Sequence, residues 1–318
     1  MQNSTLVSIV VPLLNEEESL VKLSNWIFES LKGCGFSFEI IFVDDGSEDS
    51  SWDIIIELST KFKNISGIRF TKNYGKSQAL HAGFESARGD FIVTLDADLQ
   101  DSPEEITKMI DLLNDGYDLI SGWKKKRYDS ILFKNLPSKL FNWAARRVSG
   151  IKLHDFNCGI KAYKKEVAKT INIYGEMHRF IPVLAAQEGF NKIGEQIVKH
   201  QARQFGKTKF GSDRFFRGFF DLLTIWFINK FGKRPMHFFG LIGSIMILIG
   251  FISSLYLGID KLYFETRGRL ITDRPHFYVA LTTMILGAQF FVAGFVGELI
   301  VKNKPISKRY NIISSVNS

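Results

Sequence analysis

The sequence has only two cysteines, at positions 34 and 158, and no paired-cysteine spacing. Two distant thiols support neither a disulfide framework nor a zinc site, so we expect a catalytic part that faces a reducing compartment. Near the N-terminus, Pro12 and the acidic residues 16–18 interrupt any apolar run. We therefore expect no secretory signal peptide.

Two nucleotide-binding motifs are missing where they would be needed. Neither Gly-x-Gly-x-x-Gly nor a complete P-loop follows the first strand-like segment. A dinucleotide-binding fold and a P-loop enzyme both require such a glycine-rich loop, in which backbone N–H groups approach the phosphates. Gly75-Lys76-Ser77 has no upstream glycine and follows a later segment. It predicts either a phosphate site at a helix N-terminus or a plain helix cap.

The chain is basic, with 41 Lys and Arg against 33 Asp and Glu and a formal charge of +8. Such a balance suits nucleic acid, an anionic membrane surface or an anionic substrate. The cations at 124–147 alternate with Phe, Leu and Trp, and further cations flank long apolar runs. This placement favours lipid headgroups and anionic substrates, and we expect no nucleic-acid partner.

Strand-like and helix-like segments alternate along the first 121 residues. The strand-like segments are β-branched and apolar, as in strands that are buried on both faces of a parallel sheet. The alternation predicts a doubly wound α/β fold with a mostly parallel sheet. The predicted strands are residues 6–11, which Pro12 ends, 38–43, 65–70, 91–95 and 117–121.

Three of these strands end in polar loops, at Asn15-Glu16, Asp44-Asp45 and Asp96-Ala97-Asp98-Leu99-Gln100. The carboxyl ends of parallel strands share the sheet edge at which α/β proteins bind ligands. Carboxylate and amide oxygens at i, i+2 and i+4 suit Mg²⁺ or Mn²⁺. A lone Asp-x-Asp is as readily a solvated turn, and the site hypothesis depends on three ends meeting at one edge. The loop 203–209 contributes three cations that either clamp a diphosphate or face solvent.

Two runs without charge, 238–259 and 277–297, are about 22 and about 21 residues long. Each can cross a hydrocarbon core of about 30 Å, and the alternative is a pair of buried core helices. The preceding segment mixes aromatic and basic residues and predicts a helix at the bilayer surface. Cations before the first run and after the second place both termini in the cytoplasm, with a re-entrant hairpin as the alternative.

Five motifs in this order resemble the signature blocks of the family 2 glycosyltransferases of GT-A fold. More narrowly, the chain resembles polyprenyl-phosphate glycosyltransferases related to dolichyl-phosphate mannose synthase, including bacterial undecaprenyl-phosphate glucosyltransferases with two C-terminal transmembrane helices. The resemblance covers nearly the whole chain. The motifs are Val10-Val11-Pro12-Leu13-Leu14-Asn15-Glu16, Val43-Asp44-Asp45-Gly46-Ser47, Asn73-Tyr74-Gly75-Lys76, 96–104 and 203–209.

The resemblance implies a domain organisation and a location. The expected parts are a GT-A catalytic domain at 1–211, a juxtamembrane interfacial helix region at 212–235, a two-helix transmembrane hairpin at 236–301 and a basic tail at 302–318. The protein would be an integral protein of the bacterial cytoplasmic membrane with a cytoplasmic catalytic domain, and we expect a homo-oligomer.

The resemblance also implies roles for individual residues. Asp98, Asp155 and Arg203 would be catalytic. Lys124 and Arg127 would bind the acceptor phosphate, although the family often has Arg at the position of Lys124. Asp155 begins a loose match to an Asp-x-x-x-Gly block. The metal ligands would be Asp96, Asp98 and Gln100, and the nucleotide-sugar residues would be Pro12, Leu14, Glu16, Val43, Asp45, Lys76, Asp96, Ala97, Asp98, Arg203 and Lys209.

The implied reaction is inverting, metal-dependent transfer of a hexose from a nucleotide sugar to a polyprenyl phosphate, either undecaprenyl or dolichyl phosphate. The donor prediction is UDP-glucose, with GDP-mannose and UDP-N-acetylhexosamine as alternatives. A processive polysaccharide synthase shares the sheet but would need a Gln-x-x-Arg-Trp block, which Gln201-Ala202-Arg203-Gln204-Phe205 does not supply. A membrane-anchored binding module without catalysis is the remaining alternative.

Overall fold

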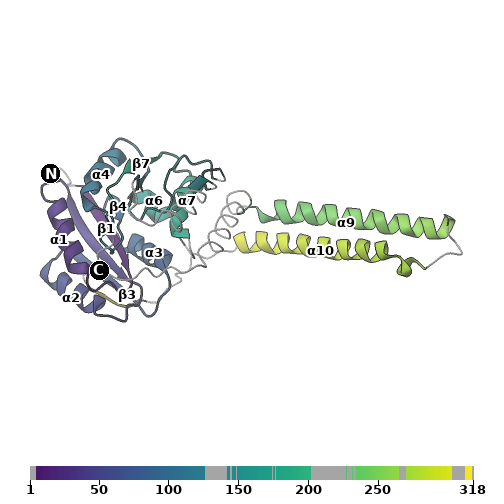
Figure 1. Ribbon diagram of the computed structural model, residues 1–318, viewed down its shortest axis with the longest axis horizontal. Helices are drawn as coiled ribbons and strands as arrows, with labels where there is room; N and C mark the ends of the chain where they lie inside the picture. Colours follow the sequence, from purple (N-terminus) through teal and green to yellow (C-terminus); the bar gives the residue numbers. More distant parts are fainter. Residues whose placement is uncertain are drawn as a thin grey trace. The chain divides into compact units, whose positions relative to one another are not determined.

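The computed structural model of the chain describes residues 5–125, 142–143, 145–147, 149–173, 175, 177–201, 227, 231, 234–264, 270–302 and 312–316. The chain divides into two compact units. One comprises Met1–Ile225 with Lys308–Ser318, and the other comprises Trp226–Ser307. The first is an α/β unit and the second is a helical hairpin (Figure 1).

The α/β unit is built on one eight-stranded sheet with the order β7-β5-β6-β4-β1-β2-β3-β8. The central strands β4, β1, β2 and β3 are parallel, which confirms the predicted doubly wound, mostly parallel sheet. β1 is buried along nearly its whole length, as its apolar sequence predicted. The strands are β1 (Leu6–Leu13), β2 (Ser37–Asp44), β3 (Ile65–Phe70), β4 (Phe91–Thr94), β5 (Leu119–Trp123), β6 (Lys161–Lys164), β7 (Ile193–Ile197) and β8 (Ile312–Val316).

Helices cover both faces of the sheet. α1, α2 and α4 bury one large core with the sheet, and α4 does so through Ile106, Met109, Ile110 and Leu113 at helical spacing. α3 packs on the opposite face, where Phe84 meets Tyr163 of β6 edge to face at 5.2 Å. The helices are α1 (Leu20–Ser30), α2 (Ser51–Lys61), α3 (Lys76–Ser86), α4 (Ile106–Asn114), α6 (Lys165–Thr170) and α7 (Ile181–Gln187), with 3-10 turns η1 (Pro103–Glu105) and η3 (Met177–Phe180).

The sequence predicted that Pro12 ends the first strand, and this prediction is wrong. β1 continues to Leu13, and Pro12 is in register with Val43 of β2. The Leu95 N–H donates to the carbonyl of Val10, so even-numbered residues of β1 direct their backbone groups toward β4. β4 itself ends at Thr94. The N–H that proline lacks therefore falls where no partner strand continues, and the proline is tolerated.

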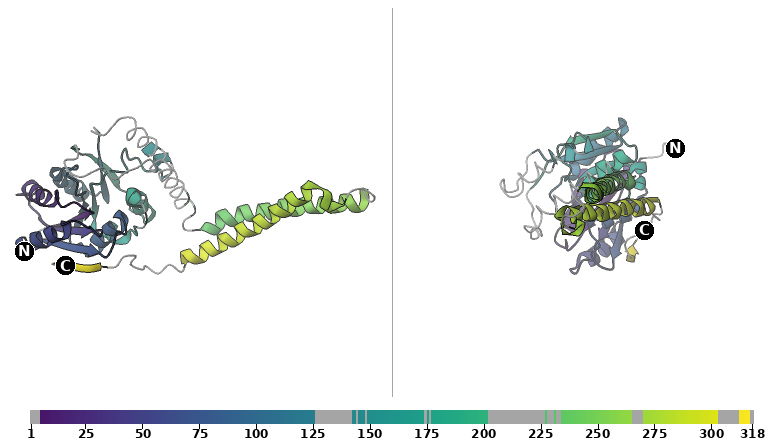
Figure 2. Two further views of the ribbon diagram at one scale, coloured as in Figure 1. Left: turned by 60° about the horizontal axis from the view of Figure 1, so that its bottom comes forward. Right: turned by 90° about the vertical axis from the view of Figure 1, so that its right-hand side faces the viewer.

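Two strands of the sheet run in a way that the sequence did not predict. β6 is antiparallel to both of its neighbours, β4 and β5, and separates them in the sheet. β8, the yellow strand at the α/β unit in Figure 2, comes from the region predicted as a tail. It pairs antiparallel with β3. Its Val316 packs against the core formed with α2. The far C-terminal segment thus covers a strand edge that would otherwise expose unpaired backbone groups.

The second unit consists mainly of α9 (Pro235–Ile259) and α10 (Pro275–Lys302). The stretches Pro235–Phe264 and Pro275–Ile300 are long and apolar enough to cross a membrane, and only 17% of the apolar window of each is buried. Buried core helices, the alternative reading, would have most of that window inside the protein. The two helices pack closely, since a Cβ at Gly243 or Gly287 would meet backbone of the other helix. Arg274 and Asp260 form an ion pair of 2.6 Å at one end of the hairpin.

The predicted interfacial helix at 212–235 lies largely outside the described residues, as do residues 303–311 of the predicted basic tail. Of this region the structure describes Phe227, Phe231, Arg234 and Pro235. Phe227 and Phe231 pack with Phe238 near the start of α9. The Phe231 and Phe238 ring centroids are 4.5 Å apart. The domain boundaries that the sequence predicts stay predictions.

Candidate active site

The loops that follow β1 and β2 are joined at the carboxyl edge of the sheet. Asn15 has a left-handed backbone with φ of 54°, and its side chain accepts a hydrogen bond from the Glu48 N–H at 2.9 Å. In return, the Asn15 N–H donates to the Ser47 hydroxyl at 2.8 Å. Asn is among the residues that tolerate this backbone conformation. The two loops therefore form one rigid wall of the edge.

Asp45, at the end of β2, holds the loop that follows β3. Its two carboxylate oxygens accept the N–H groups of Tyr74 at 2.7 Å and Gly75 at 2.9 Å. Burial raises the pKa of Asp45 to about 6, and the negative charge of Asp44 acts in the same direction. The two hydrogen bonds lower this pKa but do not outweigh burial. Asp45 was predicted to be one of the nucleotide-sugar residues, and that role stays a prediction. The structure shows that Asp45 positions the loop at residues 74–76.

The other residues predicted for a nucleoside pocket come from the ends of β1 and β2. Pro12 and Val43 are buried and in register on neighbouring strands, and Leu14 and Glu16 follow within the half-buried loop. The backbone N–H of Glu16 donates to Ser51 at the start of α2 at 2.9 Å. The structure thus brings these four residues to the same edge as Asp45, and their contact with a nucleoside stays a prediction.

The Asp96 to Gln100 loop lies beside these loops, after β4. Asp96, Asp98 and Gln100 are half-buried, while Ala97 and Leu99 between them are buried. Leu99 has φ of 60°, an unusual backbone for a bulky residue. This turn directs alternate side chains toward the core and toward the site. A strained backbone that is retained next to charged groups is common at functional sites.

Lys76 crosses from the start of α3 to this loop. Its ammonium lies 2.5 Å from Oδ1 of Asp96, and both side chains are partly exposed. Burial alone would raise the pKa of Asp96, but the charges of Lys76, Lys124 and Lys161 outweigh it and lower that pKa to about 2. Asp96 is therefore ionised at any physiological pH, within a strongly cationic surrounding.

Gly159 gives Asp96 the space that it occupies. A Cβ at Gly159 would lie 2.6 Å from Cγ of Asp96, far closer than two carbon atoms can approach. The Gly159 carbonyl accepts a hydrogen bond from the hydroxyl of Thr94 at 2.9 Å, which holds this backbone against β4. The glycine of the loosely matched Asp-x-x-x-Gly block is therefore needed for close approach to the first Asp of the metal loop.

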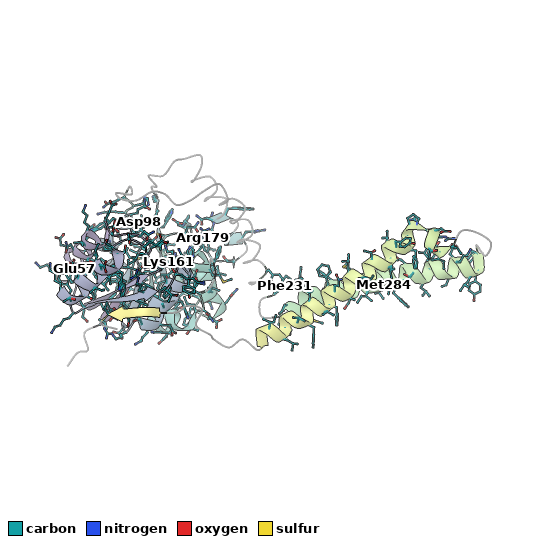
Figure 3. The ribbon with its side chains drawn as sticks, turned by 90° about the horizontal axis from the view of Figure 1, so that it is seen from below. Glu57, Asp98, Lys161, Arg179, Phe231 and Met284 are labelled. Atoms are coloured by element: carbon teal, nitrogen blue, oxygen red, sulfur yellow. The ribbon has the colours of Figure 1, made fainter. Side chains whose placement is uncertain are left out.

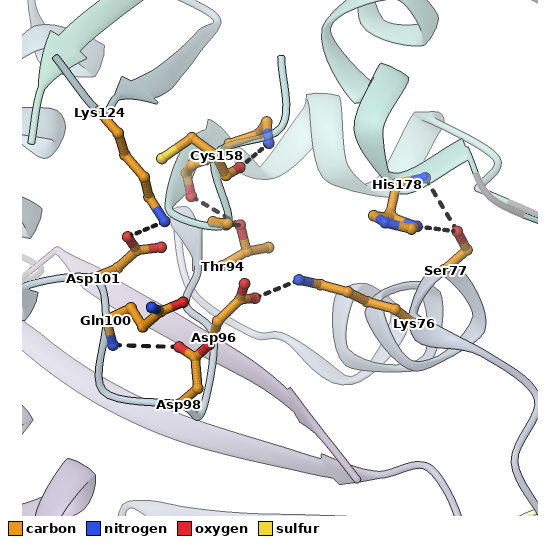
Figure 4. Close-up of polar contacts among 12 residues, drawn as sticks. Lys76, Ser77, Thr94, Asp96, Asp98, Gln100, Asp101, Lys124, Cys158 and His178 are labelled. Atoms are coloured by element: carbon orange, nitrogen blue, oxygen red, sulfur yellow. Dashed lines mark hydrogen bonds and ion pairs between the residues drawn. The ribbon is translucent and has the colours of Figure 1, made fainter. Parts of the chain in front are cut away.

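Lys124 lies at the end of β5 and is largely buried, with 12% of its side chain exposed. It pairs at 2.6 Å with Asp101, whose side chain is fully buried (Figure 4). Burial would lower the pKa of Lys124, but the carboxylate of Asp101 raises it. The pair ties β5 to the Asp96 to Gln100 loop. The predicted contact of Lys124 with an acceptor phosphate is not tested by this geometry.

Lys161 is a buried cation that the sequence analysis did not select. Its ammonium donates to the carbonyl of Cys158, and burial together with the charge of Lys76 lowers its pKa. Figure 3 shows Lys161 and Arg179 within the α/β unit, together with Asp98. The position of this lysine between Ile160 and Ala162, at the start of β6, was the available signal. Its charge is among those that lower the pKa of Asp96.

His178 of η3 packs on the start of α3. Its Nδ1 lies 3.2 Å from the Ser77 hydroxyl, and its backbone N–H donates to the same oxygen at 3.1 Å. Burial and the charge of Lys76 lower the pKa of His178 well below its ordinary value. The imidazole is therefore neutral at pH 7 and acts as a hydrogen-bonding support for the residue next to Lys76.

Asp155 is buried in the segment that leads to β6. Its Oδ1 accepts the Asn157 N–H at 3.0 Å, and its own N–H donates to Glu195 of β7 at 3.1 Å. Glu195 also binds His154, whose ring stacks on Trp123 at 4.1 Å. Asp155 thus lies in a hydrogen-bonded cluster of polar residues at the end of β5. Its predicted catalytic role stays a prediction.

Three predicted site residues, Arg127, Arg203 and Lys209, lie outside the described residues. The chain enters the 203–209 segment from Gln201, whose N–H donates to the carbonyl of Gln100 at 2.9 Å. Just before this segment, His200 forms an isolated antiparallel β-bridge with Asp101. Gln201, the last described residue before Arg203, therefore lies at the Asp96 to Gln100 loop.

The described residues could hold a divalent cation whose ligands come partly from the protein and partly from a substrate. Within the described part of the chain, no cluster of three or more His, Cys, Asp or Glu side chains is suited to a metal. The protein would therefore supply Asp96, Asp98 and the Gln100 amide. Mg²⁺ sites of this type use one or two carboxylates plus phosphate oxygens and water. The Lys76 ammonium against Asp96 shows that this position stabilises a cation.

Comparison with known proteins agrees with the motifs. The model of the family described as glycosyl transferase family 2 matches residues 8–171. Dodecaprenyl-phosphate galacturonate synthase of Rhizobium johnstonii is 35% identical over 303 residues, which cover 93% of this chain and 88% of the relative. Undecaprenyl-phosphate 4-deoxy-4-formamido-L-arabinose transferase of Pectobacterium atrosepticum is 36% identical over 295 residues, 92% of this chain and 88% of the relative.

A solved structure supports the fold. Glucosyl-3-phosphoglycerate synthase from Mycobacterium tuberculosis, in complex with Mn²⁺, UDP and glucosyl-3-phosphoglycerate, aligns with a TM-score of 0.53 and 17% identity, over 71% of this chain and 80% of that chain. At that identity the likeness concerns the fold alone, which is GT-A-like. With the family model and the relatives taken together, the chain belongs to glycosyl transferase family 2, the family that its motifs predicted.

Proposed function

We propose that this enzyme transfers a sugar from a nucleoside diphosphate donor to a polyprenyl phosphate at a membrane surface. One observation carries the proposal. At the carboxyl edge of the sheet, the carboxylates of Asp96 and Asp98 lie with the ammonium of Lys76 in one half-buried cluster. A diphosphate chelated to a divalent cation needs both signs of charge side by side. The lipid acceptor is supported by the two apolar helices and by the names of the relatives.

The donor would lie across the ends of β1, β2 and β4. Pro12, Leu14, Glu16 and Val43 would contact the nucleoside, with Asp45 near its base. The diphosphate would lie toward Ala97 and Lys76, where the N-terminus of α3 also favours anions. Arg203 and Lys209 would cover it; Gln201, which precedes them in the sequence, is hydrogen-bonded to the carbonyl of Gln100.

Asp96, Asp98 and Gln100 would hold Mg²⁺ or Mn²⁺. When bound, such an ion stabilises the charge that develops on the departing diphosphate. Lys76 and Arg203 would stabilise the same charge from other directions, through donors fixed before the reaction starts. The charges of Lys76, Lys124 and Lys161 lower the pKa of Asp96, so this carboxylate is ionised throughout the physiological range.

The acceptor requires orientation more than deprotonation. A phosphate monoester has a second pKa of about 6, so the lipid phosphate is already anionic at neutral pH. Lys124 and Arg127 would bind it, and its oxygen would attack the anomeric carbon from the face opposite the diphosphate. One displacement with inversion follows, without a covalent sugar–enzyme intermediate. Asp155, held by Asn157 and Glu195, would orient groups around this attack.

The sugar itself is best approached through a panel of donors. The sequence predicts UDP-glucose, whereas the relatives are named for galacturonate and for 4-deoxy-4-formamido-L-arabinose. These sugars differ at C4 and in the substituent that C5 carries. The panel includes UDP-glucose, UDP-galacturonate, a UDP-formamido-arabinose, UDP-N-acetylglucosamine and GDP-mannose. Membranes that contain the protein are incubated with each labelled donor and undecaprenyl phosphate, and the lipid fraction is extracted.

Asp98→Asn tests the reaction class, because it removes a metal-binding charge with little change in shape. We expect label in the lipid fraction for the wild type and a loss of about 10²- to 10³-fold in the variant, as for other residues that stabilise developing charge. Asp111→Asn, an exposed carboxylate on α4, is the matched control and should transfer at the wild-type rate. Equal transfer by Asp98→Asn and the wild type would refute the metal-dependent mechanism. Label confined to water-soluble products would refute the lipid acceptor.

The proposal also includes the predicted arrangement in the membrane. Residues 1–211 would form the catalytic domain and 236–301 the spanning hairpin, with both termini in the cytoplasm and with homo-oligomeric assembly. Cysteines introduced near residues 3 and 267 should react with a membrane-impermeant maleimide from opposite sides of inverted vesicles. Labelling of both from the same side would refute the two-span arrangement.

A further inference from the structure

We propose that Lys76 is an internal counter-cation of the metal loop: its ammonium occupies Asp96 until a donor diphosphate draws it away, so that the metal ion and the donor bind as a coupled pair. This inference rests on the proposed function, because it concerns the order in which that site is filled. It adds a second role for Lys76, which acts on metal affinity before it acts on the donor.

The ion pair between Lys76 and Asp96 is accessible and therefore exchangeable. The two side chains are 36% and 29% exposed, and their charged atoms are 2.5 Å apart. The neighbouring pair between Lys124 and Asp101 has exposures of only 12% and 0%. Removing a partner from a fully buried pair is strongly unfavourable, whereas a partly exposed pair contributes little and is readily replaced. Of these two pairs, the one that contains Lys76 is suited to open.

The backbone that carries Lys76 is held in place, so the change is confined to its side chain. On one side, Asp45 accepts the N–H groups of Tyr74 and Gly75. On the other side, the Ser77 hydroxyl bonds to His178 through both its ring and its backbone. The fixed backbone and the long lysine side chain let the ammonium swing between two anionic partners without rearranging the loop.

Competition at Asp96 follows from charge. An ammonium 2.5 Å from Oδ1 of Asp96 fills the space in which a metal ion would bind that oxygen, and it repels a dication at any nearby position. The ion therefore binds weakly while Lys76 is in place. The oxygens of a diphosphate offer Lys76 another anionic partner at the N-terminus of α3. Because coupling between two ligands is reciprocal, the diphosphate strengthens metal binding and the metal strengthens diphosphate binding.

Metal titration of the full-length protein in detergent micelles tests the inference without any transfer reaction. Mn²⁺ binding is measured by electron paramagnetic resonance with and without UDP, after correction for Mn²⁺ bound by free UDP. In the absence of UDP, Lys76→Met should bind Mn²⁺ about tenfold more tightly than the wild type, the size expected for removing a close, partly exposed like charge. The tightening of Mn²⁺ binding by UDP should be reduced by a similar factor.

Two further variants separate competition from general effects. Lys72→Met removes an exposed charge from the same loop, in which the Lys72 ammonium lies 5.3 Å from the centre of the Tyr74 ring. Because a surface charge is screened, this variant should change the Mn²⁺ affinity by less than about twofold. Lys76→Arg keeps a cation and should keep the weak Mn²⁺ binding of the wild type, which also shows that the site stays folded. Unchanged or weaker Mn²⁺ binding by Lys76→Met in the absence of UDP would overturn the inference. Failure of lipid transfer with intact coupling would instead overturn the proposed function.

Discussion

Gly159→Ala should separate the stability of the protein from the function of its metal loop. The new Cβ would lie 2.6 Å from Cγ of Asp96 and 2.9 Å from its Oδ1. Carbon atoms in contact are normally about 3.5–4.0 Å apart, so the carboxylate must move by about 1 Å. The Gly159 backbone cannot move instead without breaking the 2.9 Å hydrogen bond from Thr94.

The cost in stability should be small, because Asp96 is half-buried and can rotate about its own side-chain bonds. We expect the free energy of unfolding to fall by about 1 kcal/mol, at the lower end of the range for overpacking. The cost to function should be larger. A shift of about 1 Å at a reacting group lowers a rate by about 10²-fold, and here it also displaces a predicted metal ligand and the partner of Lys76.

Thermal unfolding in detergent, Mn²⁺ titration with UDP and transfer to lipid phosphate measure these effects separately. Gly258→Ala is the matched control, since a Cβ there has no neighbour within 4 Å and its backbone suits alanine. It should leave Mn²⁺ binding and transfer unchanged. Wild-type Mn²⁺ affinity and transfer in Gly159→Ala would show that Asp96 does not need this close approach, and the reasoning would be wrong.

Two other predictions concern buried charges. Asp45 has a pKa of about 6 in the folded protein, against an ordinary value of 3.8. Its contribution to the free energy of unfolding is therefore complete below pH 4 and is lost as the pH rises through 6, and it amounts to about 3 kcal/mol at most. Asp45→Asn should flatten the pH dependence of the free energy of unfolding between pH 4 and 7. Parallel curves for the two proteins would contradict this. Lys124→Met leaves Asp101 buried and unpaired and should lower the free energy of unfolding by about 3–5 kcal/mol, and Lys124→Met with Asp101→Asn should recover much of that loss. A double variant as unstable as the single one would contradict the role of the pair.

Sequence alone was sufficient for the features that depend on local pattern. Alternating apolar segments predicted the strands and helices of the doubly wound unit, and the charge-free runs predicted α9 and α10. The polar ends of β1, β2 and β4 predicted a shared site, because parallel strands place their carboxyl ends on one edge. Asp45, Asp96 and Asp98 were selected in this way, whereas Lys76 was selected from its place at a helix start and from the resemblance. The structure brings all four to that edge.

Other features depend on how distant segments pack, and no local pattern contains that information. β6 lies antiparallel between β4 and β5, a pairing that depends on the packing of the whole sheet. β8 pairs with β3, which precedes it by more than 240 residues. Pro12 stays within β1 because β4 ends early beside it.

The charge pairs of the site were likewise decided by tertiary structure. Lys76 meets Asp96 across 20 positions, Lys124 meets Asp101, and Gly159 makes room for Asp96 from a third segment. The chemical type of each residue was visible in the sequence, but the partner of each charge follows from strand order and loop geometry. The sequence predicted either a phosphate site or a plain helix cap around Lys76, and only the fold shows that its ammonium pairs with Asp96, a predicted metal ligand.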